Sequence, residues 1–276
     1  MILTRYAVER LLFRLSQSQY RSAFILKGAM LFSAWTERLH RPTRDLDLTS
    51  YGADSVEEIT AVFREIAEVP VAPDGLEFHP GEIAVSDIRE DQEYHGKRIV
   101  IPARLGTARI KVQVDVGFGD AVSPYVQEIG FPTLLDSPAP RIRAYPPEAV
   151  IAEKLQAMVA LGIRNSRMKD FYDLLIMSRE FSFDGGVLAA AVAATFERRS
   201  TPLPSSPPVA LSDEFGTDPD KATQWNAFLK RNRLEPPAVD FSAAVAEVSK
   251  FLSPLFRAPQ SGGLPVLTWG PGGPWR

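Results

Sequence analysis

Two aspartates two residues apart, Asp45 and Asp47, stand in the run DLDLTS. They alternate with leucines, which is the pattern of a β-strand that has one wet face. Residues i and i+2 of a strand project from the same face, so the two carboxylates are expected side by side. Close carboxylates repel each other unless a cation neutralises them. Mg²⁺ accepts one or two carboxylates and completes its shell with phosphate oxygens. The pair therefore predicts a site for Mg²⁺ (or Mn²⁺) that carries a phosphate substrate.

A third carboxylate, Asp115, lies in the run ARIKVQVDVGF (108–118). Apolar residues alternate along this run, and Asp115 falls on its polar face. Three carboxylates on neighbouring strands could hold two metal ions, one for an attacking oxygen and one for a triphosphate. An Asp-x-Asp pattern is equally typical of a solvated strand end, so its surroundings must decide between the two interpretations.

Gly28 lies between a predicted strand, 24–27, and a predicted helix, 29–35. A glycine at that point lets backbone amides at the start of a helix approach a phosphate. The alternative is a simple tight turn.

Lys154 lies in a predicted helix, 147–161, that is otherwise rich in Ala, Val, Ile, Leu and Met. A lysine there either extends its ammonium to solvent or faces an anion such as a triphosphate. Asp170 and Asp173 share one face of the next predicted helix, 169–180. Asp170 is either part of the site or an acid that stabilises the helix N-terminus. For Asp173 an ion pair with an arginine such as Arg44 is expected rather than a direct catalytic role.

The elements that position these residues form two groups. The first half predicts helices at 5–18 and 55–67 and strands at 24–27, 45–50, 83–88, 98–105, 108–118 and 141–145. The second half predicts further helices at 186–199, 221–232 and 240–252. We therefore expect an α/β (α+β) chain, with a mixed sheet and helices followed by a helical domain. The predicted parts are a sheet domain (1–146), a helical domain (147–257) and an irregular Gly/Pro-rich tail (258–276).

The composition is that of an ordinary globular protein, with 45% hydrophobic and 24% charged residues among 276. No apolar run is long enough to span a membrane, and the lack of cysteine fits a reducing cytoplasm. A net charge of −3 exerts no general pull on nucleic acid, so any such contact needs a local basic patch. Candidates for contacting an acceptor RNA are Arg41, Arg44, Arg164 and Arg167, with Lys169 in the second patch.

Taken together and in order, the segments FILKGAMLFSAW, HRPTRDLDL, VDVGFGD and PPEAVIAEKLQAMVALGIRNSRMKDFYDLL resemble the AbiEii/AbiGii-type nucleotidyltransferase toxins. That family belongs to the polymerase-beta-like nucleotidyltransferases. The resemblance implies a nucleotidyltransferase-fold sheet, a nucleoside triphosphate (NTP) substrate and a divalent metal. It also implies a role in toxin–antitoxin and phage-defence systems, a cognate antitoxin, and tRNA, at its 3′ end, as the acceptor.

The resemblance also implies roles for individual residues. Gly28 matches the glycine of the nucleotide site, although Ala29 stands where many relatives carry a second glycine or a serine. The residues that match metal-binding positions are Asp45, Asp47 and, with less diagnostic spacing, Asp115. Those grouped with nucleotide binding are Lys27, Gly28, Thr43, Lys154 and Lys169, and Asp170 completes the catalytic set.

The sequence thus predicts transfer of a nucleoside monophosphate from NTP to an acceptor hydroxyl, with release of pyrophosphate. Three alternatives remain. A glycosyltransferase also uses an Asp-x-Asp pair but has no use for Gly28, Lys154 and the Lys169-Asp170 motif. A protein hydroxyl, such as a serine of an antitoxin, could replace RNA as the acceptor. A non-catalytic binding protein on the same fold would not need the carboxylate pair.

Overall fold

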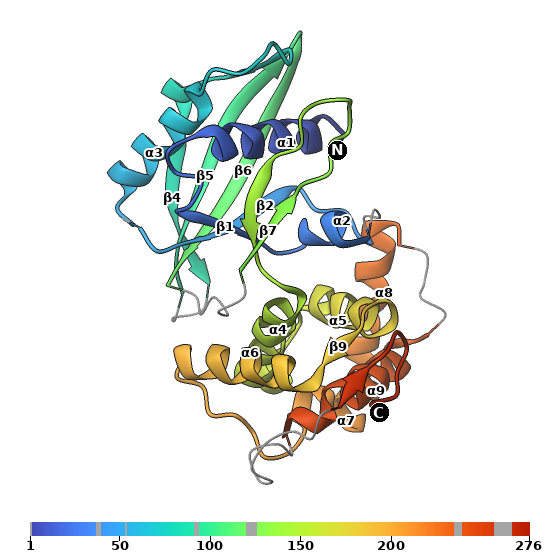
Figure 1. The fold of residues 1–276 in the computed structure, drawn as a ribbon. Helices are drawn as coiled ribbons and strands as arrows, with labels where there is room; N and C mark the ends of the chain where they lie inside the picture. Colours follow the sequence, from blue (N-terminus) through green and yellow to red (C-terminus); the bar gives the residue numbers. More distant parts are fainter. Residues whose placement is uncertain are drawn as a thin grey trace. The chain divides into compact units, whose positions relative to one another are not determined.

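The computed structural model describes residues 2–36, 40–52, 54–90, 94–119, 126–234, 239–256 and 267–276. These residues divide into two compact units, one ending at Tyr145 and the other beginning at Pro146. Figure 1 shows each unit in the colours of its part of the sequence. None of the helices in these ranges combines the length and the apolar character that a membrane span requires.

The first unit is built on a mixed β-sheet. Its described strands follow the order β3-β5-β6-β2-β1-β8-β7, and β4 pairs with β5 beside β3. β2 runs parallel to β6 and β1 runs parallel to β8, whereas the other neighbours are antiparallel. The strands are β1 (Phe24–Lys27), β2 (Asp45–Ser50), β3 (Leu76–Phe78), β4 (Ala84–Glu90), β5 (Tyr94–Leu105), β6 (Ala108–Phe118), β7 (Gln127–Gly130) and β8 (Arg141–Ala144).

Helices α1 (Ile2–Gln17) and α3 (Val56–Glu68) pack against each other and against this sheet (Figure 1). The start of α3 is set by Ser55, whose hydroxyl accepts from the Glu58 N–H as an N-cap and donates to the Glu58 carboxylate. A short helix, α2 (Leu31–Thr36), follows β1, and a 3-10 turn, η1 (Pro80–Glu82), precedes β4.

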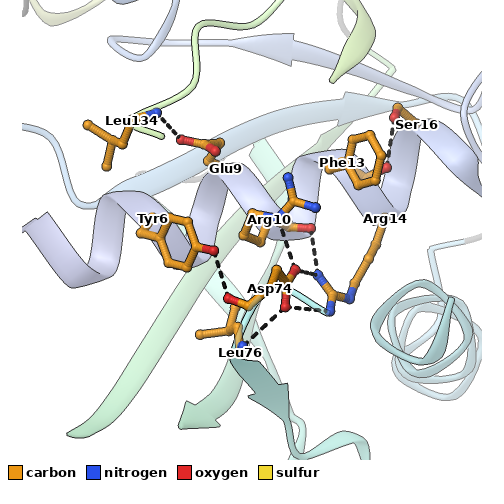
Figure 2. A network of polar contacts seen from close by, with 9 residues as sticks. All are labelled: Tyr6, Glu9, Arg10, Phe13, Arg14, Ser16, Asp74, Leu76 and Leu134. Atoms are coloured by element: carbon orange, nitrogen blue, oxygen red, sulfur yellow. Dashed lines mark hydrogen bonds and ion pairs between the residues drawn. The ribbon is translucent and has the colours of Figure 1, made fainter. Parts of the chain in front are cut away.

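A buried cluster of ion pairs links α1 to Asp74, in the loop that precedes the edge strand β3 (Figure 2). Arg10 Nε and Arg14 Nη1 donate to the same carboxylate oxygen of Asp74, at 2.9 and 2.7 Å. Burial by itself raises the pKa of Asp74, but the hydrogen bonds from Arg14 and Arg10 outweigh it and leave this pKa below its ordinary value. On the same helix, Glu9 accepts a hydrogen bond from the backbone N–H of Leu134 at 2.7 Å. These contacts join α1 to two loops that are distant in sequence.

The second unit is mainly helical. Four of its helices are capped by an aspartate or serine that accepts a hydrogen bond from a first-turn N–H, as the unpaired amides of a helix start require. Helix α4 packs on α6, and α5 packs on α9. The helices are α4 (Pro147–Leu161), α5 (Met168–Glu180), α6 (Gly185–Arg198), α7 (Asp213–Thr217), α8 (Pro219–Asn232) and α9 (Phe241–Leu252), with 3-10 turns η2 (Gly162–Arg164), η3 (Val209–Leu211) and η4 (Ser253–Phe256).

The end of the chain departs from the irregular tail predicted for 258–276. Residues 258–266 lie outside the described part, but Thr268–Trp269 form strand β10, which pairs with β9 (Phe183–Asp184). The indole of Trp269 is 3% exposed and donates to the Ser178 carbonyl at 2.7 Å. Burying an aromatic ring whose N–H finds a partner stabilises this segment. Glycine and proline content alone does not reveal that stabilisation.

Candidate active site

The register between β2 and β6 brings the predicted carboxylates together. Asp47 lies opposite Asp115 in the parallel pairing, and Asp45 lies opposite Gln113. Leu46 is 1% exposed, as is Leu48, whereas the aspartates beside them are partly exposed. All three carboxylates therefore lie on the polar face of two adjacent strands, as the alternation along each strand predicts.

Gly28 lies against the carboxylate of Asp47. Its φ of +77° is in the left-handed region, which glycine adopts without steric cost. A Cβ built on Gly28 would lie 2.8 Å from Asp47 Cγ and closer still to the carboxylate oxygen Oδ2. The absence of a side chain at this position therefore leaves the space that the Asp47 carboxylate occupies.

Replacing Gly28 with alanine is expected to lower nucleotide transfer by displacing the Asp47 carboxylate. The left-handed backbone should also cost about 1–2 kcal/mol of stability. The matched control is Gly106→Ala, because Gly106 has a φ of +58° but nothing within 4 Å of its added Cβ. Thermal unfolding and transfer are measured for both. Equal transfer by the two variants would contradict a special role for Gly28.

Arg98, a residue that the sequence did not indicate, engages Asp115. It lies directly opposite Asp115 in the antiparallel register of β5 and β6. Its Nε donates to Oδ1 at 2.9 Å and its Nη2 donates to Oδ2 at 2.7 Å. The bidentate arrangement matches the planar fork of a guanidinium to a carboxylate. Only pairing between strands could reveal this contact, because the two residues belong to different strands.

The donor set fits a hard divalent cation at Asp45 and Asp47. Both offer carboxylate oxygens from one strand face, and Mg²⁺ needs one or two such ligands when phosphates supply the others. Within the described ranges, no group of three or more His, Cys, Asp or Glu side chains is arranged to hold a metal ion. Arg98 engages both carboxylate oxygens of Asp115, so in this arrangement the third carboxylate is directed to a cation of the protein itself.

In the second unit, Lys154 is the centre of a buried ion cluster. Its Nζ lies 2.7 Å from Asp170 Oδ1 and 2.8 Å from Asp173 Oδ2, and both carboxylates are almost fully buried. Arg167 Nε donates to the other oxygen of Asp170 at 2.7 Å. Burial alone raises the pKa of Asp170, but Lys154 and Arg167 outweigh it and hold this pKa far below its ordinary value. Lys154 thus pairs with two carboxylates of its own unit, and Asp173 pairs with this lysine, where the sequence predicted an arginine such as Arg44.

The other predicted residues occupy more exposed positions. Lys27 ends β1 directly opposite Asp47 in the antiparallel register. Thr43 donates to the Asp45 carbonyl at 3.5 Å, a long contact. Arg44, Arg164 and Lys169 are exposed, whereas Arg41 and Arg167 are partly exposed.

Among the solved structures that share this fold are two proteins from Helicobacter pylori. One is JHP933 from Helicobacter pylori, at 14% sequence identity and a TM-score of 0.52, over 94% of this chain and 93% of that one. The other is an H. pylori protein described as a "putative nucleotidyltransferase", again at 14% identity and a TM-score of 0.52, over 95% of this chain and 96% of that one. No curated protein matches the sequence. The architecture is therefore that of the nucleotidyltransferase fold, as the sequence predicted.

The model of the nucleotidyl transferase AbiEii toxin family, the toxins of type IV toxin–antitoxin systems, matches residues 10–247. The chain belongs to this family. The resemblance found in the sequence is confirmed, and the family implies a nucleotidyltransferase toxin with an antitoxin as its partner.

Proposed function

We propose that this protein transfers a nucleoside monophosphate from an NTP to a hydroxyl of RNA, at the 3′ end of tRNA. The observation that carries the proposal is the pairing of Asp47 with Asp115 across β2 and β6, with Asp45 on the same face. Asp45 and Asp47 offer carboxylate ligands to the cation of a metal–triphosphate, and the lack of a side chain at Gly28 leaves room for the Asp47 carboxylate.

The proposed reaction is a single displacement at the α-phosphorus. The acceptor hydroxyl oxygen forms a bond to that phosphorus while the bond to the bridging oxygen of the β-phosphate breaks. Pyrophosphate leaves with the bonding electrons, and the hydroxyl proton passes to water. Catalysis then rests on positioning the reactants and on neutralising the charge that develops on phosphate oxygens.

The chain's residues divide these tasks. Asp45 and Asp47 hold the divalent cation, which when bound neutralises phosphate charge and polarises the reacting oxygens. Gly28 keeps the backbone close to Asp47, while Lys27 and Thr43 lie on the segments that flank the pair. In the second unit, Lys154 and Lys169 are proposed to supply positive charge to nucleotide binding. Asp170 orients Lys154 through the 2.7 Å contact between them.

For the acceptor we propose contacts with RNA phosphates at exposed arginines of the two predicted patches. Arg44 precedes the carboxylate pair, and Arg164 precedes α5. Arg41 belongs to the same patch as Arg44. Arg167 belongs to the same patch as Arg164, although its guanidinium also donates a hydrogen bond to Asp170. Phosphate contacts release counterions, so RNA labelling should weaken steeply as salt rises.

Incubation with each labelled NTP, Mg²⁺ and total tRNA is expected to label RNA. Arg164→Glu should reduce this labelling about tenfold, since it replaces a phosphate contact with a repulsion. Arg164 is chosen because reversal of Arg167 would also disturb Asp170. Lys250→Glu, an exposed charge reversal on α9, controls for the change in net charge. NTP affinity should remain the same in both variants.

The result separates RNA from other acceptors. Equal RNA labelling by Arg164→Glu and Lys250→Glu would remove the Arg164 patch from the acceptor path. Labelled protein without labelled RNA would identify a protein hydroxyl, such as an antitoxin serine, as the acceptor. Absence of label from both, with folded protein and every NTP, would contradict nucleotide transfer altogether.

A further inference from the structure

Asp115 is already engaged by a cation from its own sheet. The two hydrogen bonds from Arg98 use both of its carboxylate oxygens, and the amide of Gln113 adds longer contacts at 3.3 and 3.4 Å. An arginine fork that binds both oxygens competes with a divalent cation for the same lone pairs. In this arrangement Asp115 cannot serve fully as a third metal ligand.

The Arg98–Asp115 pair is partly exposed to solvent. The Arg98 side chain is 43% exposed and that of Asp115 is 18% exposed. The bidentate geometry favours the pair, whereas the exposure of the guanidinium allows water to screen it and to receive it when it rotates away. The pair of Lys154 and Asp170 differs, because its side chains are 13% and 2% exposed. The Arg98 guanidinium therefore lies where solvent can hydrate it when it leaves Asp115.

The position of the Arg98–Asp115 pair means that loss of Arg98 changes the charge balance among the neighbouring carboxylates. Asp115 faces Asp47 across the β2–β6 register, so the guanidinium neutralises one of three neighbouring carboxylates. Without such neutralisation, like charges on one sheet face destabilise each other. A cation that binds all three carboxylates must take over the charge-neutralising role of Arg98.

We propose that Arg98 is an internal counterion that holds Asp115 until a divalent cation binds, and that its departure from Asp115 accompanies binding. This inference rests on the proposed function, in which Asp45 and Asp47 hold the cation. Arg98 is a positioning residue in this scheme, because it acts through Asp115. It weakens cation binding at the third carboxylate and so ties completion of the site to the arrival of the metal–nucleotide.

The test is Mn²⁺ binding to the full chain, measured by titration with and without a non-hydrolysable NTP. Arg98→Met should tighten Mn²⁺ binding about fivefold, the equivalent of removing a weak competing ion pair. Arg98→Lys keeps the charge but loses the fork, so it should tighten binding less. The matched control is Arg104→Met on the same strand, an exposed arginine that lies opposite Arg109 rather than Asp115.

An Asp115→Asn background completes the test. There the effect of Arg98→Met should disappear, because the carboxylate for which the two cations compete is gone. Equal tightening by Arg98→Met and Arg104→Met, or an effect that persists in Asp115→Asn, would overturn the counterion role while leaving the metal site intact. Absence of Mn²⁺ binding to the folded wild type under both conditions would instead refute the metal-dependent function, and the counterion role with it.

Discussion

Asp47→Asn is expected to lower nucleotide transfer about a hundredfold or more while the protein stays folded. An asparagine keeps the size of the side chain but removes the negative charge that a divalent cation requires of its ligand. Asp47 is partly exposed and lies opposite Asp115, so the substitution relieves a repulsion between like charges and leaves a polar side chain in place. The measurement is transfer to tRNA under saturating NTP, with the thermal midpoint recorded for the same sample. Asp45→Asn should behave in the same way.

The control for this substitution is Asp87→Asn on β4. Asp87 is also a strand aspartate, 69% exposed and paired with Lys97, so its replacement should leave transfer unchanged. Expression of the wild type should slow bacterial growth, as expected of a toxin, whereas Asp47→Asn should not. Full transfer by folded Asp47→Asn would refute the assignment of this carboxylate to the metal.

Lys154→Met is expected to destabilise the second unit by about 3–5 kcal/mol, because it removes the ammonium that two buried carboxylates share and leaves only Arg167 beside Asp170. Asp170 and Asp173 are 2% and 3% exposed, so neither can be solvated in place of the lost ammonium. Thermal or urea unfolding measures the loss. Lys250→Met, at an exposed position of α9, is the matched control and should change stability by less than about 0.5 kcal/mol.

A second substitution separates the structural role of Lys154 from nucleotide binding. In the double variant with Lys154→Met, Asp173→Asn removes a buried carboxylate charge that Lys154 no longer neutralises. This change should restore part of the stability. If Lys154 also binds phosphates, transfer should stay low in this double variant. Recovery of transfer together with stability would restrict Lys154 to a structural role.

The pH dependence of stability provides another check on the same cluster. The pKa of Asp170 is held below its ordinary value, so its contribution to stability is present at neutral pH. That contribution is lost only as pH falls below about 4, the pKa of an unfolded aspartate, toward the folded value. In Lys154→Met, burying a protonated carboxyl costs less free energy than burying a carboxylate that has lost the lysine. The variant should therefore be less destabilised, relative to wild type, at acidic pH than at neutral pH.

Long periodic segments were predictable from the sequence to within a few residues. The predicted strands 45–50 and 108–118 and the predicted helix 147–161 coincide with β2, β6 and α4. Alternation and helical spacing are local properties that many residues repeat, so each additional residue strengthens the prediction. Strands β3 and β7 were not predicted, because segments of three and four residues hold too little periodicity. They become strands through pairing with β5 and β8.

The sequence by itself determined that Asp45 and Asp47 share one strand face. It also showed a glycine, carboxylates and a lysine in the same order along the chain as in the nucleotidyltransferases that it resembles. Side chains alternate along a strand whatever its neighbours are, so Asp45 and Asp47 had to lie together. Only the tertiary structure decided that Asp115 lies opposite Asp47, that Arg98 engages it, and that Lys154 is held between two buried carboxylates. These contacts join residues that are far apart in the chain. Their register and burial depend on the packing of whole elements, which no local pattern encodes.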